Sequence, residues 1–318
     1  MTNLIDHILS LFKINDVNAH VGYLVNDELK SNLNGSDFNY LLNSIRINWE
    51  NFYVLLFLAL VCTFGVFIYR NKIVRNKVRG IILKLESYED LVPWMLRLSL
   101  GILLIGAGAT KTLITPVMEA NSLISNLEII VGFCILLGFL MPVTILFGLF
   151  LYFFALNGNI YYLGNLEILG ALLGMLILAN SRPGVDDILG LIKLNLFSKY
   201  RKFVPIILRV SIGVAFIYLG LWEKILNPHM SEYIVNTYNL NYYIQVNSAI
   251  WVLGAGLIEI LLGIFFLIGY KIRFTAVLSF LVLSLSFFFF AEEVYAHVTL
   301  FGVLSAILVY GKGRLNGK

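Results

Sequence analysis

The feature that most constrains this chain is a series of apolar stretches long enough to cross a lipid bilayer. A spanning helix needs about 20 mostly apolar residues, and 59% of the 318 residues are hydrophobic whereas 13% are charged. Soluble domains carry about 25% charged residues, so a soluble fold is excluded. We expect about nine spans, at 51–69, 92–110, 121–141, 143–157, 165–181, 203–222, 248–269, 273–290 and 297–311. The predicted fold class is therefore an all-α polytopic membrane protein.

The distribution of Lys and Arg over the loops predicts the orientation. The loops on one side carry sixteen of these residues and those on the other side carry five. Because cytoplasmic loops are enriched in Lys and Arg, we expect an N-terminus outside and a C-terminus in the cytoplasm, with the protein in the plasma membrane. The sequence pI near 8.9 does not indicate a nucleic-acid partner, because the cations are spread over these loops. The expected partner is the lipid bilayer.

Two parts of the chain resemble each other. "PWMLRLSLGILLIGAGATKTLITP" at 93–116 aligns with "PIILRVSIGVAFIYLGLWEKILNP" at 205–228 at an offset of 112 residues. The alignment then continues with Glu128, Gly132 and Gly138 over Glu259, Gly263 and Gly269, at an offset of 131. Its last part places Asn165 over His297 and Gly170 over Gly302, at an offset of 132. These matches predict a tandem duplication of a four-helix unit, with an insertion of about 19 residues in the second copy.

The duplication predicts the domain organisation. Both units begin and end on the same side of the membrane, so they are parallel four-helix bundle repeats related by an axis along the membrane normal. The one remaining span is an N-terminal anchor helix. The expected segments are an extracytoplasmic tail (1–50), the anchor (51–69), a basic cytoplasmic loop (70–91), the first repeat (92–184), a cytoplasmic linker (185–202) and the second repeat (203–318).

Four charged residues fall within the predicted spans: Glu128, Glu259, Arg97 and Arg209. A charged side chain at the centre of a bilayer costs about 2.5–3.5 kcal/mol even on insertion scales. Each glutamate either links helices as a protonated structural group or binds a proton or ligand; the first is favoured, since fold-supporting residues survive duplication together. Each arginine either extends to lipid headgroups or pairs with a carboxylate of a neighbouring helix. The matched glycines are expected to permit close helix packing.

Polar and aromatic side chains gather at the outer end of the second unit: Trp222, Glu223, Lys224, His229, Glu292, Glu293, Tyr295 and His297. One interpretation is an interfacial belt of aromatic and charged residues. Another is a pocket for a quinone or similar small ligand. In it His297 or Glu293, which share a face if their turn is helical, would handle protons, and Trp222, Lys224 and Tyr295 would contact the ligand. No metal site is predicted, because His229, Glu293 and His297 lack the spacing of a ligand set.

The pattern R-x3-G-x6-G-x-x-x-K, followed by E-x3-G-x5-G and by the closing "YAHVTLFGVLSAILVYGKGR", resembles DoxX/DoxD-type membrane proteins. The resemblance covers both units and is better in the second. It implies four transmembrane helices per unit. DoxD-like members are subunits of a thiosulfate:quinone oxidoreductase, and other members are linked to membrane redox assemblies. For this chain it therefore implies an integral membrane subunit of a redox complex, with other membrane subunits as partners and quinone as a possible cofactor.

Two alternatives stay open. In the first alternative, the chain is a non-catalytic structural or assembly subunit of a larger membrane enzyme complex. This alternative predicts stable partners and tolerance of substitutions at the outer end. Or it is a proton-coupled small-molecule transporter with Glu128 and Glu259 as proton sites near the middle of the membrane. A resemblance in fold does not decide between these functions.

Overall fold

A computed structural model of the chain describes residues 33, 37–47, 72–178, 184–190, 197–243, 245–290 and 294–311. Within these ranges the chain is helical, and no strand occurs beyond an isolated bridge between Thr112 and Glu119. The protein is thus all-α in the part that the structure describes. The predicted anchor at 51–69 lies outside the described residues.

Eight apolar helices coincide with the eight other predicted spans. In the segment predicted as the first repeat, called the first unit below, they are α6 (Val92–Thr110), α7 (Ser122–Leu137), α8 (Met141–Gly158) and α9 (Leu166–Leu178). In the second they are α11 (Val204–Tyr218), α13 (Ser248–Ile268), α14 (Ile272–Phe290) and α15 (Val294–Tyr310). Counted with their flanking helical turns, five are long and apolar enough to cross a membrane, and α7, α14 and α15 are shorter apolar helices.

The remaining α-helices are α3 (Phe38–Ile47), α5 (Lys72–Glu86), α10 (Val185–Ile188) and α12 (Pro228–Thr237). A 3-10 turn at Ile160–Asn165 precedes α9, and a π-helical segment at Leu219–Leu226 continues α11. Most of α12 lies in the segment 230–248, where the insertion is predicted.

Local sequence explains the borders of the spanning helices. Pro93 and Pro205 stand in the first turns of α6 and α11, where a missing N–H costs no hydrogen bond. Gly138 and Gly269 end α7 and α13 in the left-handed conformation, which glycine adopts without strain. The side chain of Asn121 caps α7 by accepting a hydrogen bond from the N–H of Ile124.

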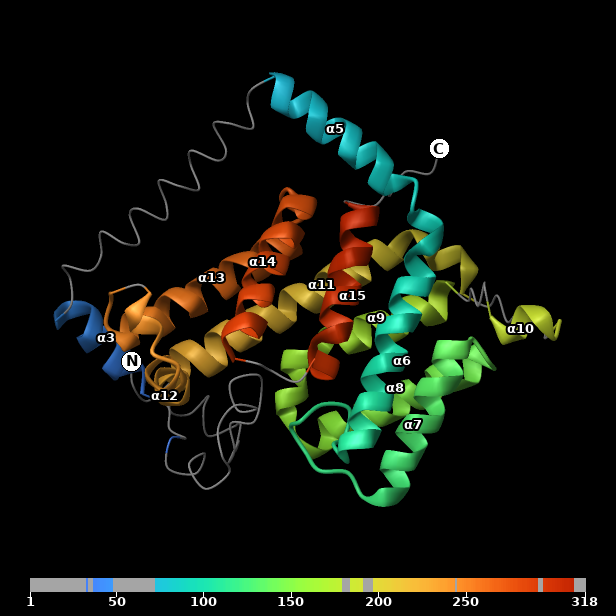
Figure 1. The fold of residues 1–318 in the computed structure, drawn as a ribbon, viewed down its shortest axis with the longest axis horizontal. Helices are drawn as coiled ribbons and strands as arrows, with labels where there is room; N and C mark the ends of the chain where they lie inside the picture. The colour runs from blue at the N-terminus through green and yellow to red at the C-terminus, as the bar shows by residue number, and fades with distance from the viewer. Residues whose placement is uncertain are drawn as a thin grey trace.

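The first helix of each unit packs against its own second helix and against the last helix of the other unit. Thus α6 packs on α7 and α15, and α11 packs on α13 and α9; Figure 1 shows the turquoise-green α6 beside the red α15. Gly170 of α9 lies against Ser211 of α11, and Gly302 of α15 lies against Ser99 of α6. Buried side chains of both units therefore form one continuous core.

Close approach between helices depends on paired glycines. A Cβ atom added to Gly101 would lie 3.0 Å from the carbonyl oxygen of Gly132, and one added to Gly213 would lie 3.0 Å from that of Gly263. Small residues that let backbones touch are typical of helix pairs in membranes. The prediction that these glycines serve packing agrees with these contacts.

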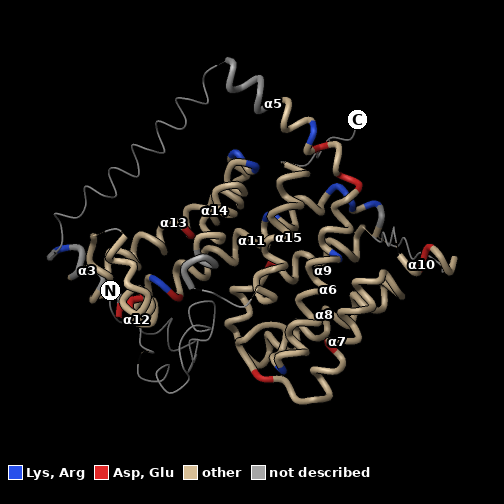
Figure 2. The backbone as a smooth tube through the Cα atoms, viewed as in Figure 1, with Lys and Arg blue, Asp and Glu red and all other residues tan. Residues whose placement is uncertain are grey.

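The outer surface of the helices is apolar, as a bilayer requires. Large apolar side chains are exposed along one side of α8 and of α14. Figure 2 shows Lys, Arg, Asp and Glu mainly near the ends of the helices, with long uncharged stretches between them. Because monomeric soluble proteins rarely expose apolar patches larger than a few hundred Å², these helices identify an integral membrane protein.

Candidate functional site

Glu128 supports a buried loop. Its side chain on α7 is fully buried, and its Oε1 accepts a hydrogen bond of 2.7 Å from the N–H of Ile114. Ile114 has a φ of +61°, which is unusual for a β-branched residue and needs support from its surroundings. The carboxylate thus fixes the loop that connects α6 to α7.

Further buried groups hold the same loop. The N–H of Leu113 donates to the carbonyl of Met118 at 2.8 Å. The hydroxyl of Tyr162 donates to the carbonyl of Leu113, and the hydroxyl of Tyr152 donates to the carbonyl of Tyr162 at 2.7 Å. Glu128 and these tyrosine hydroxyls therefore hold the same loop. The role of Glu128 as a protonated group that links helices stays a prediction.

Glu259 has a different partner. The Nζ atom of Lys224 lies 2.9 Å from Oε2 of Glu259 and 3.6 Å from Oε2 of Glu223. The side chains of Lys224 and Glu223 are 12% and 0% exposed, and that of Glu259 is 21% exposed. We call Glu223, Lys224 and Glu259 the Lys224 cluster. Fully ionised, it carries one net negative charge inside the membrane-spanning part of the protein.

The π-helical segment places Lys224 against α13. A Cβ atom added to Gly220 would lie 2.7 Å from the carbonyl oxygen of Gly256, so the two helices touch along their backbones here. One added to Gly256 would lie 3.0 Å from the Cβ of Lys224. π-helical turns frequently occur at functional sites, and this one aims the ammonium of Lys224 at Glu259.

An aromatic group lies next to the Lys224 cluster in the chain. The indole N–H of Trp222 donates to the hydroxyl of Tyr161 at 2.6 Å. The rings of Tyr218 and Trp222 are stacked, with centroids 6.4 Å apart and an interplanar angle of 9°. Since Tyr161 precedes α9 and Trp222 follows α11, these rings link the two halves of the described helices.

The other predicted ligand-binding residues have separate surroundings. The hydroxyl of Tyr295 lies 3.0 Å from the hydroxyls of both Thr110 and Thr112. His297 is buried in α15, with 2% of its surface exposed. The structure therefore joins Tyr295 to α6, whereas Lys224 contacts Glu223 and Glu259. Glu292 and Glu293 lie outside the described residues.

Sequence reasoning missed the pairing of Lys224 with Glu259. It considered arginine partners for the two glutamates, but Glu128 binds a backbone N–H and Glu259 binds a lysine. Arg97 is buried and is attracted by the carboxylate of Asp187 on α10. The guanidinium of Arg209 lies against Gly269, at the end of α13. One sequence signal could have placed Lys224 at a helix interface. Lys224 follows the helix-packing Gly220 by four residues and so lies one helical turn away on the same face.

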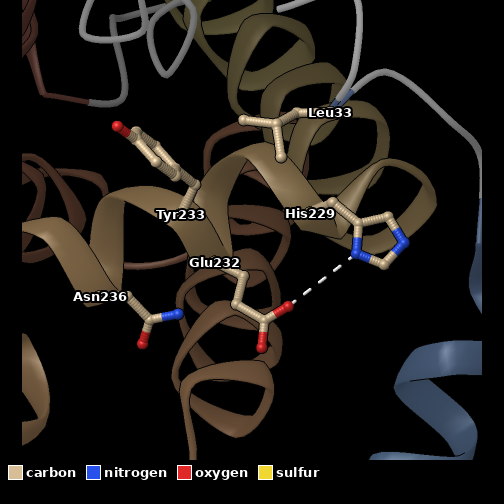
Figure 3. A pocket seen from close by; sticks show the side chains of 5 residues that line it. All are labelled: Leu33, His229, Glu232, Tyr233 and Asn236. Atoms are coloured by element: carbon tan, nitrogen blue, oxygen red, sulfur yellow. Dashed lines mark ion pairs between the residues drawn. The ribbon is translucent and has the colours of Figure 1, made fainter. Parts of the chain in front are cut away.

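A separate open pocket of about 460 Å³ lies at α12. Figure 3 shows its lining by Leu33, His229, Glu232, Tyr233 and Asn236. His229 Nδ1 lies 3.9 Å from Glu232 Oε2, whose carboxylate also accepts a hydrogen bond of 2.7 Å from Tyr40. No group of three or more potential metal ligands occurs among the residues that the structure describes.

Residues 204–292 match the family model DoxX. The chain carries a DoxX domain. The match extends from α11 to the end of α14, so this DoxX domain contains Arg209 and the whole Lys224 cluster. The resemblance inferred from the sequence is thereby confirmed over this segment. No curated protein and no solved structure matches the chain.

Proposed function

We propose that this chain is an integral membrane subunit of a membrane redox complex, and that its Lys224 cluster exchanges protons with a quinone. The observation that carries the proposal is a lysine held between two carboxylates within the spanning helices of the DoxX domain. Membrane-embedded charges are costly and mark functional sites by default.

The charge of the cluster suits proton exchange. Three ionised groups leave one negative charge in a region of low dielectric, and a single proton on a carboxylate removes it. Glu259 is the more exposed of the two carboxylates, so it is the better placed to receive a proton from outside the cluster. The cluster can therefore hold or release one proton without a change in fold.

The residues present fit a quinone headgroup. A quinone carries electron pairs in the membrane and takes up two protons when it is reduced. The Lys224 ammonium can donate a hydrogen bond to a carbonyl oxygen, and Glu259 can deliver or accept a proton. Trp222, from the predicted ligand set, is partly buried against the core and is a neighbour of Glu223 and Lys224 in the chain. Electrons would come from a partner subunit of the complex.

We also propose that the two units arose by duplication. The support is that matched glycines make matched contacts, Gly101 with Gly132 and Gly213 with Gly263. The predicted orientation, with the N-terminus outside and the C-terminus in the cytoplasm of the plasma membrane, completes the proposal. His297 and Glu293 remain predicted proton-handling residues of the second unit.

The test is purification from native membranes in mild detergent, with mass spectrometry of partner proteins and bound lipophilic molecules. We expect partner subunits and a quinone with the wild-type chain and with Lys111→Met, an exposed control at the end of α6. We expect the quinone to be lost in Lys224→Met. Stable partners with no quinone would support the structural-subunit alternative, and a lone protein with neither would contradict the proposal and direct the work to transport.

A further inference from the structure

Two turns of the protein have the same backbone but different partners. In the first unit Gly138 and Leu140 adopt positive φ angles of 70° and 46°, and α8 begins at Met141. In the second, Gly269 and Lys271 adopt 78° and 39°, and α14 begins at Ile272. Two arginines hold matching positions in α6 and α11. Arg97 and Arg209 each follow the first proline of their helix by four residues.

Acidic side chains of α10 fill the first site. The carboxylate of Asp186 accepts hydrogen bonds from the N–H groups of Leu140 at 2.8 Å and of Met141 at 3.1 Å. The next residue, Asp187, attracts the guanidinium of Arg97. This site is therefore an anion site at a helix N-terminus, and its anions belong to the chain itself.

The second site, at the turn after Gly269, has Arg209 but no counterpart of Asp186 and Asp187. Residues 260–291 and 294–318 contain no Asp or Glu. The Nε atom of Arg209 is buried and has no hydrogen-bond acceptor among the described residues, and its guanidinium lies against Gly269. By contrast, Arg273 nearby in the chain is bound by Glu86 and by the carbonyls of Leu308 and Val309. Arg209 thus has a donor that an anion from outside the chain can satisfy.

The surroundings of Arg209 fit a lipid. Large apolar side chains are exposed beside it on α11 and at the turn: Val210, Val214, Ile268 and Phe274. Tyr270 is also exposed, with the ammonium of Lys271 5.6 Å from the centre of its ring. Tyrosine and lysine are typical of the level of lipid headgroups, and apolar residues of the level of acyl chains.

We propose that Arg209 and the turn Gly269–Ile272 bind the phosphate of an anionic phospholipid, in the place that Asp186 and Asp187 fill in the first unit. The guanidinium donates to the phosphate oxygens, and the N-terminus of α14 faces the same charge. The acyl chains lie along the exposed apolar residues of α11 and α14. This inference does not involve the Lys224 cluster, so its failure and the failure of the proposed quinone role are distinguishable.

The test is native mass spectrometry of the full chain released from nanodiscs that contain equal parts of phosphatidylglycerol and phosphatidylcholine. We expect one phosphatidylglycerol to be retained by the wild-type chain. Its affinity should fall roughly tenfold or more in Arg209→Met, because charged hydrogen bonds are lost, and less in Arg209→Lys. The control is Lys199→Met, which removes an exposed cation near the start of α11 and should leave retention unchanged.

Equal retention of phosphatidylglycerol by wild type and by both Arg209 variants would overturn the proposal. So would equal retention of phosphatidylcholine by the wild-type chain. Displacement of the lipid by excess inorganic phosphate would show that the site recognises phosphate alone and would overturn the assignment to a lipid. Thermal unfolding of each variant in detergent identifies a folding defect, and Arg209→Lys keeps the comparison valid if Arg209→Met fails to fold.

Discussion

The same acid has two environments in the two units of this protein. In the first unit Glu128 is fully buried and binds the N–H of Ile114. In the second, Glu259 is partly exposed and lies 2.9 Å from the ammonium of Lys224. The first carboxylate supports a backbone conformation, whereas the second belongs to a cluster of charges.

The difference follows from what comes before each acid in the chain. The helix α6 ends at Thr110, and Lys111 takes a φ of +58° and begins the loop that Glu128 holds. The helix α11 instead continues as the π-helical segment to Leu226 and carries Lys224 to α13. Two glutamates at matching positions of the predicted repeats therefore have different partners.

The largest effect is expected where the units are alike. A Cβ atom at position 263 would lie 2.6 Å from the carbonyl oxygen of Gly213, and one at position 132 would lie 2.9 Å from that of Gly101. We expect Gly132→Ala and Gly263→Ala each to destabilise the protein by about 1–3 kcal/mol, measured by thermal unfolding in detergent. Gly254→Ala is the control, because a Cβ there meets nothing within 4 Å. A neutral result in one unit only would show that the helix pairs are not equivalent.

The next prediction separates the roles of the two acids. Glu128→Ala leaves the buried N–H of Ile114 without an acceptor, which costs about 1–3 kcal/mol. Glu128→Gln keeps an acceptor oxygen and should cost less than about 1 kcal/mol. Denaturation of both variants measures these values. An equal decrease in the free energy of unfolding of the two variants would mean that the charge of Glu128, rather than its hydrogen bond, stabilises the protein.

A double-mutant cycle tests the ion pair of the second unit. The side chains of Lys224 and Glu259 contact each other. We therefore expect a coupling free energy of about 0.5–3 kcal/mol between Lys224→Met and Glu259→Gln. The matched cycle of Lys111→Met with Glu128→Gln should show no coupling, because Glu128 binds Ile114 and not Lys111. Coupling of similar size in both cycles would contradict the contrast between the units.

The smallest effect is expected at a contact between the units. Tyr295→Phe removes the hydroxyl that bonds Thr110 and Thr112, and should cost about 0.5–1.5 kcal/mol. Tyr242→Phe is the control, since that side chain is exposed. A stability change no greater than that of the control would mean that this bond contributes nothing to joining α15 to α6.

The helices were largely predictable from the sequence, because apolar length sets a spanning helix. The span expected at 92–110 is α6 to the residue, and the seven other spans that fall within the described residues differ from their helices at the ends by a few residues. The pairing of Lys224 with Glu259 was not predicted, since 35 positions separate them and their contact depends on how α11 approaches α13. The partner of Glu128 is a backbone N–H, which every residue but proline carries and which no sequence pattern reveals.

The decisive measurement for the roles of the two acids is the amount of quinone bound per protein in wild type, Glu128→Gln and Glu259→Gln, purified side by side from native membranes. We expect quinone in the wild-type protein and in Glu128→Gln, and its loss in Glu259→Gln while the protein stays folded. Equal quinone in all three proteins, or none in the wild type, would contradict the assignment of Glu259 and Lys224 as the functional pair.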